Sequence, residues 1–246
     1  MYFWVVTSRK ALLSAGLLAT ATYLLLWLAV SVNWSWLHVA DNWVLRHFHD
    51  AGAHHPAWTV FWQAVSDVLS PTALRIVALV GVIVALLRRA TGAAVFLTLT
   101  VGAMGLVTVT AKALADRPRP STALTAESST AFPSGHALGI TVGVLALITV
   151  AWPHLRPSMR RPVAGMGVLL IVLVGVARVA LNVHHPSDVL AGWSLGLLYY
   201  LLCMPLLGAR FPGSGESEGG VGSKSRSGFS RTNSAHQDRV SDETTQ

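Results

Sequence analysis

The polar and apolar positions of this chain fall into long blocks rather than into the alternating faces of soluble helices or strands. A helix that crosses a bilayer needs about 20 mostly apolar residues. Six blocks meet that need, so the pattern predicts an all-α bundle of six membrane-spanning helices. We place these helices at about 11–33, 68–87, 91–111, 135–152, 163–181 and 187–207. The first block is too long for a signal peptide and lacks a small-residue cleavage site, so we expect it to be retained.

Two segments lie outside these blocks. Residues 34–66 are too polar to span, and their tryptophans are typical of an interfacial segment because tryptophan prefers the headgroup level. These tryptophans are Trp34, Trp36, Trp43, Trp58 and Trp62. From about residue 211 the chain is rich in glycine and serine with mixed charge, which predicts a disordered tail.

Composition supports a membrane protein over a soluble one. The chain of 246 residues is 52% hydrophobic and 12% charged, with a mean hydropathy of +0.53, whereas soluble domains carry about 25% charged residues. The net charge of +7 is compatible with nucleic-acid binding, but the placement of the cations argues against it. Cys203 is the only cysteine, which excludes an intramolecular disulfide and a cysteine-based metal cluster.

Basic residues set the expected orientation, because cytoplasmic loops carry an excess of lysine and arginine. With a cytoplasmic N-terminus, 12 of the 18 basic residues fall inside. The other six are Arg46, Arg75, Lys112, Arg117, Arg119 and Arg178. Single outer cations are ordinary headgroup contacts, but four of these six gather at 112–119 and around 178. We therefore expect a cytoplasmic N-terminus at 1–10, an integral membrane domain at 11–207 and a cytoplasmic tail at 208–246, in the plasma membrane.

Three short stretches lie on the outer side in this topology. They are "KALADRPRP" from Lys112, "FPSGH" from Phe132, and "ARVALNVHHPSD" from Ala177. Taken alone, Lys112 reads equally well as a snorkelling lysine, and "PSGH" as a turn that enters a helix. Taken together, the stretches bring cations, histidines and an aspartate to one membrane face. Charged groups beside membrane spans tend to be functional because they are expensive there.

The residue types in these three stretches are suited to binding a phosphate ester. Lys112, Arg119 and Arg178 can neutralise phosphate oxygens. Ser134 is a plausible N-cap of the fourth span, where free backbone N–H groups attract anions, and Gly135 allows close backbone approach.

The histidines and the aspartate provide the groups that catalysis requires. His136 and His184 can divide nucleophilic attack and proton delivery. Asp188 follows His184 by four residues in the first turn of the last span. There it can hold the near ring nitrogen of His184 and leave the other nitrogen free to act.

In order and spacing these stretches resemble the type 2 phosphatidic acid phosphatase superfamily, which includes the vanadium haloperoxidases. The family pattern is Lys, six residues, Arg-Pro; then Pro-Ser-Gly-His; then Ser-Arg, five residues, His, three residues, Asp. This chain matches it at every fixed position except Ala177, where the pattern has serine. The resemblance covers about residues 60–207. It implies the six-helix bundle of the lipid phosphatase and haloperoxidase type.

The resemblance also implies roles for these residues. His184 would attack phosphorus and form a phosphohistidine, with Asp188 orienting it, and His136 would protonate the leaving oxygen. The phosphoryl oxygens would be bound by Lys112, Arg119, Ser134, Gly135 and Arg178. No cofactor or metal is implied, and no carboxylate cluster suggests one.

Several neighbouring residues are not assigned to the core of the predicted site. His185 is interpreted as a headgroup or supporting contact, because only His184 has the required separation from Arg178 and Asp188. Arg117 and Asp116 are interpreted as an exposed ion pair on the loop, although Arg117 is also placed to touch a diphosphate. The histidines of the tryptophan-rich segment are interpreted as surface residues rather than metal ligands. They are His38, His47, His49, His54 and His55.

The predicted function is hydrolysis of a membrane lipid phosphate or diphosphate at an extracytoplasmic site. The family's substrates are phosphatidic acid, phosphatidylglycerol phosphate and undecaprenyl diphosphate. Three alternatives remain open: a lipid phosphotransferase that uses the same histidine, a vanadate-dependent haloperoxidase, and a non-catalytic scaffold. The natural lipid and the oligomeric state are left open by the sequence.

Overall fold

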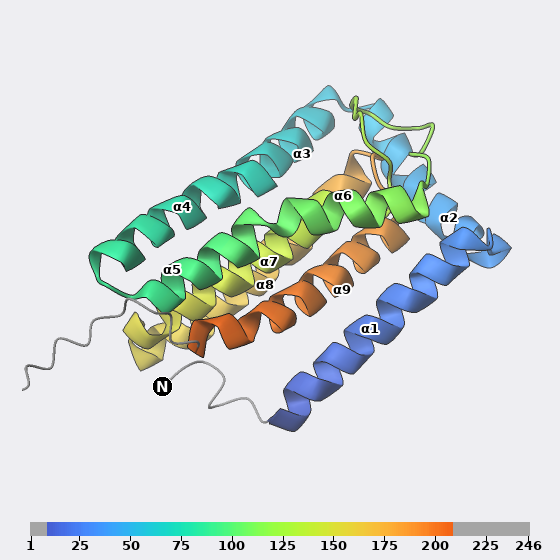
Figure 1. The fold of residues 1–246 in the computed structure, drawn as a ribbon. Coiled ribbons are helices and arrows are strands. Elements are labelled where there is room, and N and C mark those ends of the chain that lie inside the picture. The colour runs from blue at the N-terminus through green and yellow to red at the C-terminus, as the bar shows by residue number, and fades with distance from the viewer. Residues whose placement is uncertain (1–8, 209–246) are drawn as a thin grey trace, which may run out of the picture. The chain divides into compact units, whose positions relative to one another are not determined.

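Nine α-helices and short helical turns make up residues 9–208, which are the residues that the computed structural model describes (Figure 1). The helices are α1 Arg9–Ser31, α2 Ser35–Ala53, α3 Pro56–Val68, α4 Pro71–Leu87, α5 Thr91–Leu97, α6 Met104–Ala115, α7 Gly135–Ala151, α8 Pro157–Ala180 and α9 Pro186–Cys203. These residues contain no β-strand, so the all-α prediction is confirmed. The predicted cytoplasmic tail lies outside the described residues except for residue 208.

Within residues 9–208, six segments are long and apolar enough to cross a membrane, as predicted. They are Lys10–Ser31, Pro56–Leu87, Thr91–Ala115, Gly135–His154, Pro157–Ala180 and Pro186–Leu207. The third combines α5, a π-helical turn at Thr98–Gly102 and α6. The chain therefore has the build of a multi-pass membrane protein.

The second segment differs most from the prediction. It begins at Pro56, so the expectation that residues 34–66 stay outside the spans is wrong for α3. Within α3, the Gln63 side-chain amide nitrogen donates to Asp67 Oδ1 over 2.8 Å, so the helix pairs these two polar groups with each other. Ser70 then caps α4 by accepting from the amide of Ala73 over 3.2 Å, so the chain breaks its helix without leaving the apolar segment.

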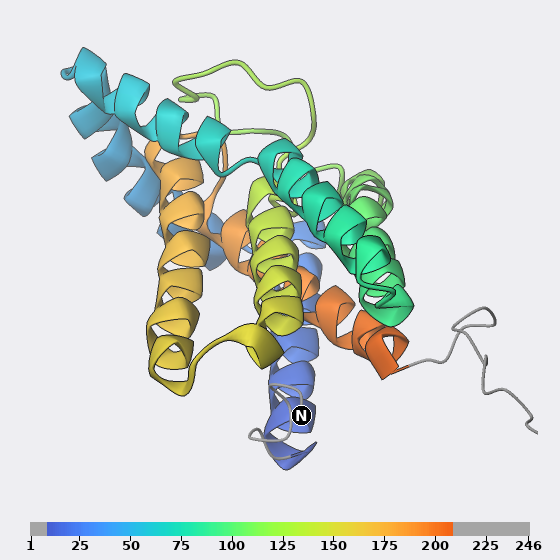
Figure 2. The same ribbon diagram turned by 90° about the vertical axis from the view of Figure 1, so that its left-hand side faces the viewer.

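Helix α7 forms the centre of the bundle and contacts α4, α6, α8 and α9 (Figures 1 and 2). Its contact with α9 is close because α9 presents glycine there. A Cβ atom on Gly192 would lie 2.6 Å from the carbonyl oxygen of Ser134. Small residues allow membrane helices to approach closely, and here they hold the starts of α7 and α9 together.

The two ends of the bundle differ in the segments that they carry. The α4–α5 and α7–α8 connections lie at one end (Figure 2). The loop 116–134, the α8–α9 turn and α2 lie at the other. The fold therefore brings the three motif stretches to one end of the bundle.

Candidate active site

A pocket of about 340 Å³ contains most of the predicted site residues. Its walls come from α4, α6 and α7, from the loop 116–134 and from the α8–α9 turn. Five predicted residues line it: Lys112, Arg119, Gly135, His136 and His184. Both candidate catalytic histidines therefore face one cavity. This placement is what nucleophilic attack by one histidine and proton delivery by the other require. Three predicted residues, Ser134, Arg178 and Asp188, are buried behind its walls.

Arg119 connects the loop to the α8–α9 turn. Its Nη1 donates to the carbonyl oxygen of Val183 over 2.7 Å and lies 3.3 Å from Nε2 of His184. Its Nε donates to the carbonyl oxygen of Ser129 over 2.5 Å. Burial lowers the pKa of Arg119, and the charge of Glu127 opposes this effect. The guanidinium is thus held on the pocket wall next to the candidate nucleophile.

The contact with Arg119 defines the tautomer of His184. A guanidinium only donates hydrogen bonds, so Nε2 of His184 accepts and its proton resides on Nδ1. Burial lowers the pKa of His184 to about 4, the Arg178 and Arg119 charges add to this effect, and Asp188 partly opposes it. The ring is therefore neutral at pH 7, with the Nε2 lone pair on the pocket side.

Asp188 lies beside both histidines of the α8–α9 turn. Its Oδ2 is 3.6 Å from Nδ1 of His184, which is longer than a hydrogen bond. The same oxygen accepts from the backbone amide of His185 over 2.8 Å and lies 3.1 Å from its Nδ1. His185 does not line the pocket, and its contact with Asp188 agrees with a supporting role.

A buried network holds Asp188 from the other side. Arg117 Nη1 donates to Asp188 Oδ1 over 2.6 Å and to Ser187 Oγ over 2.8 Å. Its Nη2 donates to Oδ2 of Asp41 in α2 over 2.9 Å. The predicted exposed pair with Asp116 is therefore wrong. Asp116 ends α6 in the left-handed region (φ 41°) and stays exposed, and the chain turns Arg117 into the bundle.

Arg178 is also held by partners that the motif does not reveal. It is 1% exposed, its Nη1 donates to Ser66 Oγ over 2.7 Å, and its Nη2 donates to Glu127 Oε1. The other Glu127 oxygen lies 3.6 Å from Arg119 Nη2. Burial raises the pKa of Glu127, but the hydrogen bond and charge of Arg178 outweigh it and leave the pKa lowered. The ionised carboxylate of Glu127 thus pairs with Arg178 and lies close to Arg119, which are two of the residues predicted to bind phosphate.

The start of α7 has the predicted cap. Ser134 Oγ accepts from the amide of Ala137 over 3.4 Å, and its own amide donates to the carbonyl oxygen of Asp188 over 2.9 Å. The first N–H groups of a helix have no partner within it, and Gly135 places this terminus on the pocket wall. Ala177, which replaces the serine of the family pattern, is fully buried and does not line the pocket.

Among residues 9–208, no group of three or more His, Cys, Asp or Glu side chains is arranged so that it could hold a metal ion. His47 of α2 and His54, which follows α2, instead lie close to backbone carbonyls. Nδ1 of His47 lies 2.7 Å from the oxygen of Trp43, and Nδ1 of His54 lies 2.7 Å from that of Asp50.

Four residues that shape the site were not singled out from the sequence as site residues: Asp41, Arg75, Arg117 and Glu127. Arg75 and Glu127 line the pocket, and Asp41 supports Arg117. The repeated "RPRP" was a usable signal for Arg117, and the outer location of Arg75 was a signal for that residue. No sequence signal marks Asp41 or Glu127.

The curated relatives are bacterial and archaeal enzymes. The chain is 36% identical over 117 residues to phosphatidylglycerophosphatase B of Bacillus subtilis, covering 46% of this chain and 58% of that protein. It is 37% identical over 67 residues to an undecaprenyl-diphosphatase of Sulfolobus acidocaldarius, covering 26% and 28%. The chain thus spans less than two thirds of the length of either relative.

The fold also matches a solved structure. The crystal structure of a transmembrane PAP2-type phosphatidylglycerolphosphate phosphatase from Bacillus subtilis superposes with a TM-score of 0.60 and 23% identity. The match covers 77% of this chain and 94% of that one. The PAP2 superfamily model matches residues 93–212, which include all three motif stretches but not residues 60–92 of the expected core. Residues 93–212 of this chain are therefore similar to the PAP2 superfamily.

Proposed function

We propose that the protein is an integral membrane lipid phosphatase that works through a phosphohistidine on His184. One observation carries this proposal. The Nε2 atom of neutral His184 contacts Arg119 on the wall of a pocket that also holds His136 and Lys112. A nucleophile, a second histidine and two cations thus converge where one phosphoryl group can bind. Phosphoryl transfer depends mainly on such positioning and charge stabilisation.

The first half of the reaction cleaves the ester. Nε2 of His184 attacks phosphorus while the bond from phosphorus to the lipid oxygen breaks. Protonated His136 gives its proton to that oxygen, so the alcohol leaves neutral. Asp188 stabilises the positive charge that develops on the His184 ring, from which its Oδ2 lies 3.6 Å.

The second half releases phosphate. Neutral His136 takes a proton from water, whose oxygen attacks phosphorus as the bond to Nε2 breaks. Inorganic phosphate leaves and both histidines return to their starting states. Lys112 and Arg119 neutralise the phosphoryl oxygens in both steps, and the α7 terminus at Gly135 supplies uncharged donors.

Glu127 must release its cations for this cycle. Its carboxylate pairs with Arg178 and lies near Arg119. A phosphate dianion carries more charge and more acceptor oxygens, so it can replace the carboxylate on these guanidiniums. Arg178 then contacts phosphate only after this exchange.

The substrate is a lipid phosphate or diphosphate. The two curated relatives are named for phosphatidylglycerophosphate and undecaprenyl diphosphate, and phosphatidic acid shares the same reacting group. The motif residues lie at the ends of candidate spans, where a lipid headgroup reaches the cations while its tail stays in the bilayer.

The site is proposed to face away from the cytoplasm, with cytoplasmic termini. Cations at the opposite end of the bundle support this orientation, because cytoplasmic loops favour them. Those described are Lys10, Arg88, Arg89, Arg156, Arg160 and Arg161. In a Cys203→Ala background, Ser121→Cys on the exposed loop should react with an impermeant thiol reagent in intact cells. Reaction only after permeabilisation would reverse the orientation.

A substrate panel tests the proposed function. Purified protein with EDTA is expected to release inorganic phosphate from at least one of phosphatidic acid, phosphatidylglycerophosphate and undecaprenyl diphosphate. His184→Ala is the matched inactive control. Activity that disappears with EDTA would replace the histidine mechanism with a metal one. Transfer of the phosphoryl group to an added alcohol, with no release to water, would identify a phosphotransferase.

A further inference from the structure

Arg75 is a cation of the pocket to which the family motifs give no role. It lies in the second turn of α4, inside the candidate span Pro56–Leu87, and its side chain lines the pocket with α6. An arginine inside a span is costly and is usually functional. Its position therefore calls for an anionic partner.

No such partner exists among residues 9–208. The other pocket arginines are held by protein groups: Arg119 by Val183 and Ser129, and Arg178 by Ser66 and Glu127. Arg75 makes no hydrogen bond or ion pair with another described residue. Its guanidinium is free to bind a ligand.

Helix α6 fixes where this guanidinium lies. A Cβ atom on Gly105 would sit 2.9 Å from Nη2 of Arg75, so the guanidinium packs against the bare glycine. Gly105, Thr108 and Lys112 lie on the face of α6 that lines the pocket. Lys112 follows Gly105 by seven residues, which is about 10 Å along a helix.

The direction of this separation matters. Lys112 is in the last turn of α6 at the site end of the bundle, and Gly105 lies toward the middle of the span. A lipid whose terminal phosphate meets Lys112 extends its tail in the same direction. Arg75 thus lies on the path between the scissile phosphate and the tail.

We propose that Arg75 binds a second phosphate of the substrate, the phosphodiester that joins the headgroup to the lipid glycerol. This inference rests on the proposed function. The two phosphorus atoms of a diphosphate share one bridging oxygen and are too close to span two helical turns. A phosphomonoester and a phosphodiester separated by a glycerol reach further, which makes a phosphatidylglycerophosphate-like headgroup the best fit.

The test compares two lipids with the same acyl chains and the same type of scissile monoester. Phosphatidylglycerophosphate carries the additional phosphodiester, and phosphatidic acid does not. Arg75→Gln is expected to lower kcat/KM for phosphatidylglycerophosphate by about tenfold or more, mainly through KM, because charge-assisted contacts are among the strongest hydrogen bonds. The value for phosphatidic acid is expected to change by less than about twofold, because no contact is lost.

Two further variants separate binding from general charge effects. Gly105→Ala displaces the end of a flexible side chain and is expected to show the same selectivity in weaker form. Arg46→Gln removes an exposed arginine of α2 outside the pocket and is expected to affect neither lipid.

The outcomes are distinct. Equal losses on both lipids, or an undiminished kcat/KM for phosphatidylglycerophosphate, would overturn the role of Arg75 while the phosphatase remains. A wild-type protein that hydrolyses neither of these lipids would overturn the role of Arg75, and one that also leaves undecaprenyl diphosphate intact would overturn the proposed function.

Discussion

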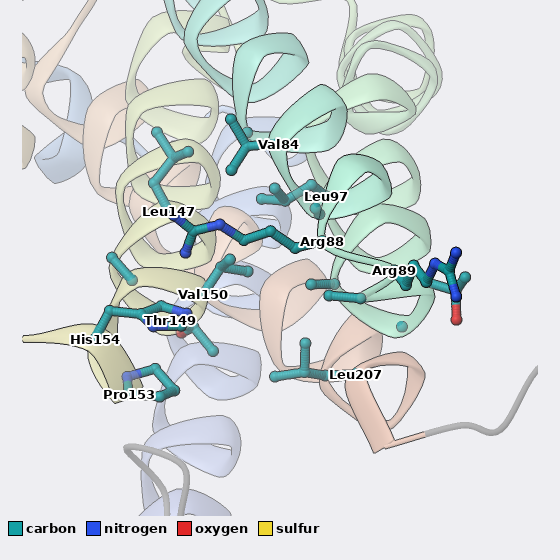
Figure 3. A pocket seen from close by; sticks show the side chains of 17 residues that line it. Val84, Arg88, Arg89, Leu97, Leu147, Thr149, Val150, Pro153, His154 and Leu207 are labelled. Carbon is teal, nitrogen blue, oxygen red and sulfur yellow. The ribbon is translucent and has the colours of Figure 1, made fainter. Parts of the chain in front are cut away.

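The two ends of the bundle each hold a pocket with arginines in its wall, but their side chains are organised differently. The pocket at the end away from the motifs is the larger, at about 680 Å³. Figure 3 shows Arg88 extending across it, with His154 on the far side. Arg88, Arg89 and His154 are exposed. At the motif end the pocket is half that size, and Arg117, Arg178 and Asp188 behind it are buried and bonded.

Under the proposed function, this difference means that volume and positive charge do not by themselves make a catalytic site. Both pockets contain an arginine and a histidine. Only at the motif end is a histidine held in one tautomer, with Arg119 on one ring nitrogen and Asp188 near the other. A fixed arrangement of charges stabilises a transition state without reorganisation, and the exposed side chains at the other end lack one.

The largest expected contrast is between the two histidines of these pockets. His184→Ala removes the nucleophile and should lower kcat by more than about a thousandfold. His154→Ala is the matched change in the other pocket and should leave kcat within about twofold. Steady-state phosphate release from a lipid phosphate measures both. Comparable losses in the two variants would erase the distinction between the pockets.

The next contrast is between buried and exposed arginines. Arg117→Gln leaves two buried carboxylates, Asp41 and Asp188, without their cation and should cost about 3–5 kcal/mol of stability. Arg88→Gln in the exposed pocket should cost less than about 0.5 kcal/mol. Thermal denaturation in detergent compares them.

A double variant checks the network itself. Adding Asp41→Asn to Arg117→Gln should cost less than the sum of the two single changes, because both remove the same ion pair. Strict additivity would show that the Arg117–Asp41 contact does not contribute to the folded state.

A smaller effect is expected from the carboxylate that occupies the cation cluster. Glu127→Gln removes a competitor for Arg178 and Arg119, and should tighten competitive inhibition by inorganic phosphate by about two- to fivefold. Asp50→Asn, on the exposed face of α2, is the control and should have no effect. Weaker inhibition in Glu127→Gln would show that Glu127 organises the cluster rather than competing for it.

The smallest expected change is in the protonation of His184 above pH 5. Because burial lowers its pKa to about 4, the ring should stay neutral from pH 7.5 to pH 5. The unfolded chain binds this proton near pH 6.5, so the contribution to stability is complete above that pH and is lost as the pH falls toward 4. NMR of histidine-labelled protein, with His184→Gln for assignment, measures the titration. A midpoint near 6.5 would mean that the ring is solvated.

The placements that the sequence predicted and the structure shows depend on local signals. Ser134 and Gly135 form the expected N-cap and helix start, because capping is decided within four residues. Lys112, His136 and His184 meet in one pocket because each lies close to the end of a candidate span at the same membrane face. Long apolar blocks likewise predicted the six spans.

The residues that were missed depend on contacts between distant parts of the chain. Arg117 and Asp41 are 76 residues apart, and Arg178 and Ser66 are 112 apart. Neither sequence separation belongs to a motif or to a helical repeat, so neither contact could be predicted from the sequence. The start of the second candidate span was placed later than the structure has it, because the sequence does not show that polar residues of α3 pair with each other, as Gln63 and Asp67 do.

Trapping the reaction intermediate tests the central claim most directly. The protein is mixed with a lipid carrying a ³²P-labelled terminal phosphate, quenched in alkali within milliseconds, digested and mapped. The account predicts a base-stable, acid-labile phosphoryl group on the His184 side chain. It should persist in His185→Ala, be absent in His184→Ala and disappear as water releases phosphate. A label on His185 or His136, or full turnover by His184→Ala, would contradict it.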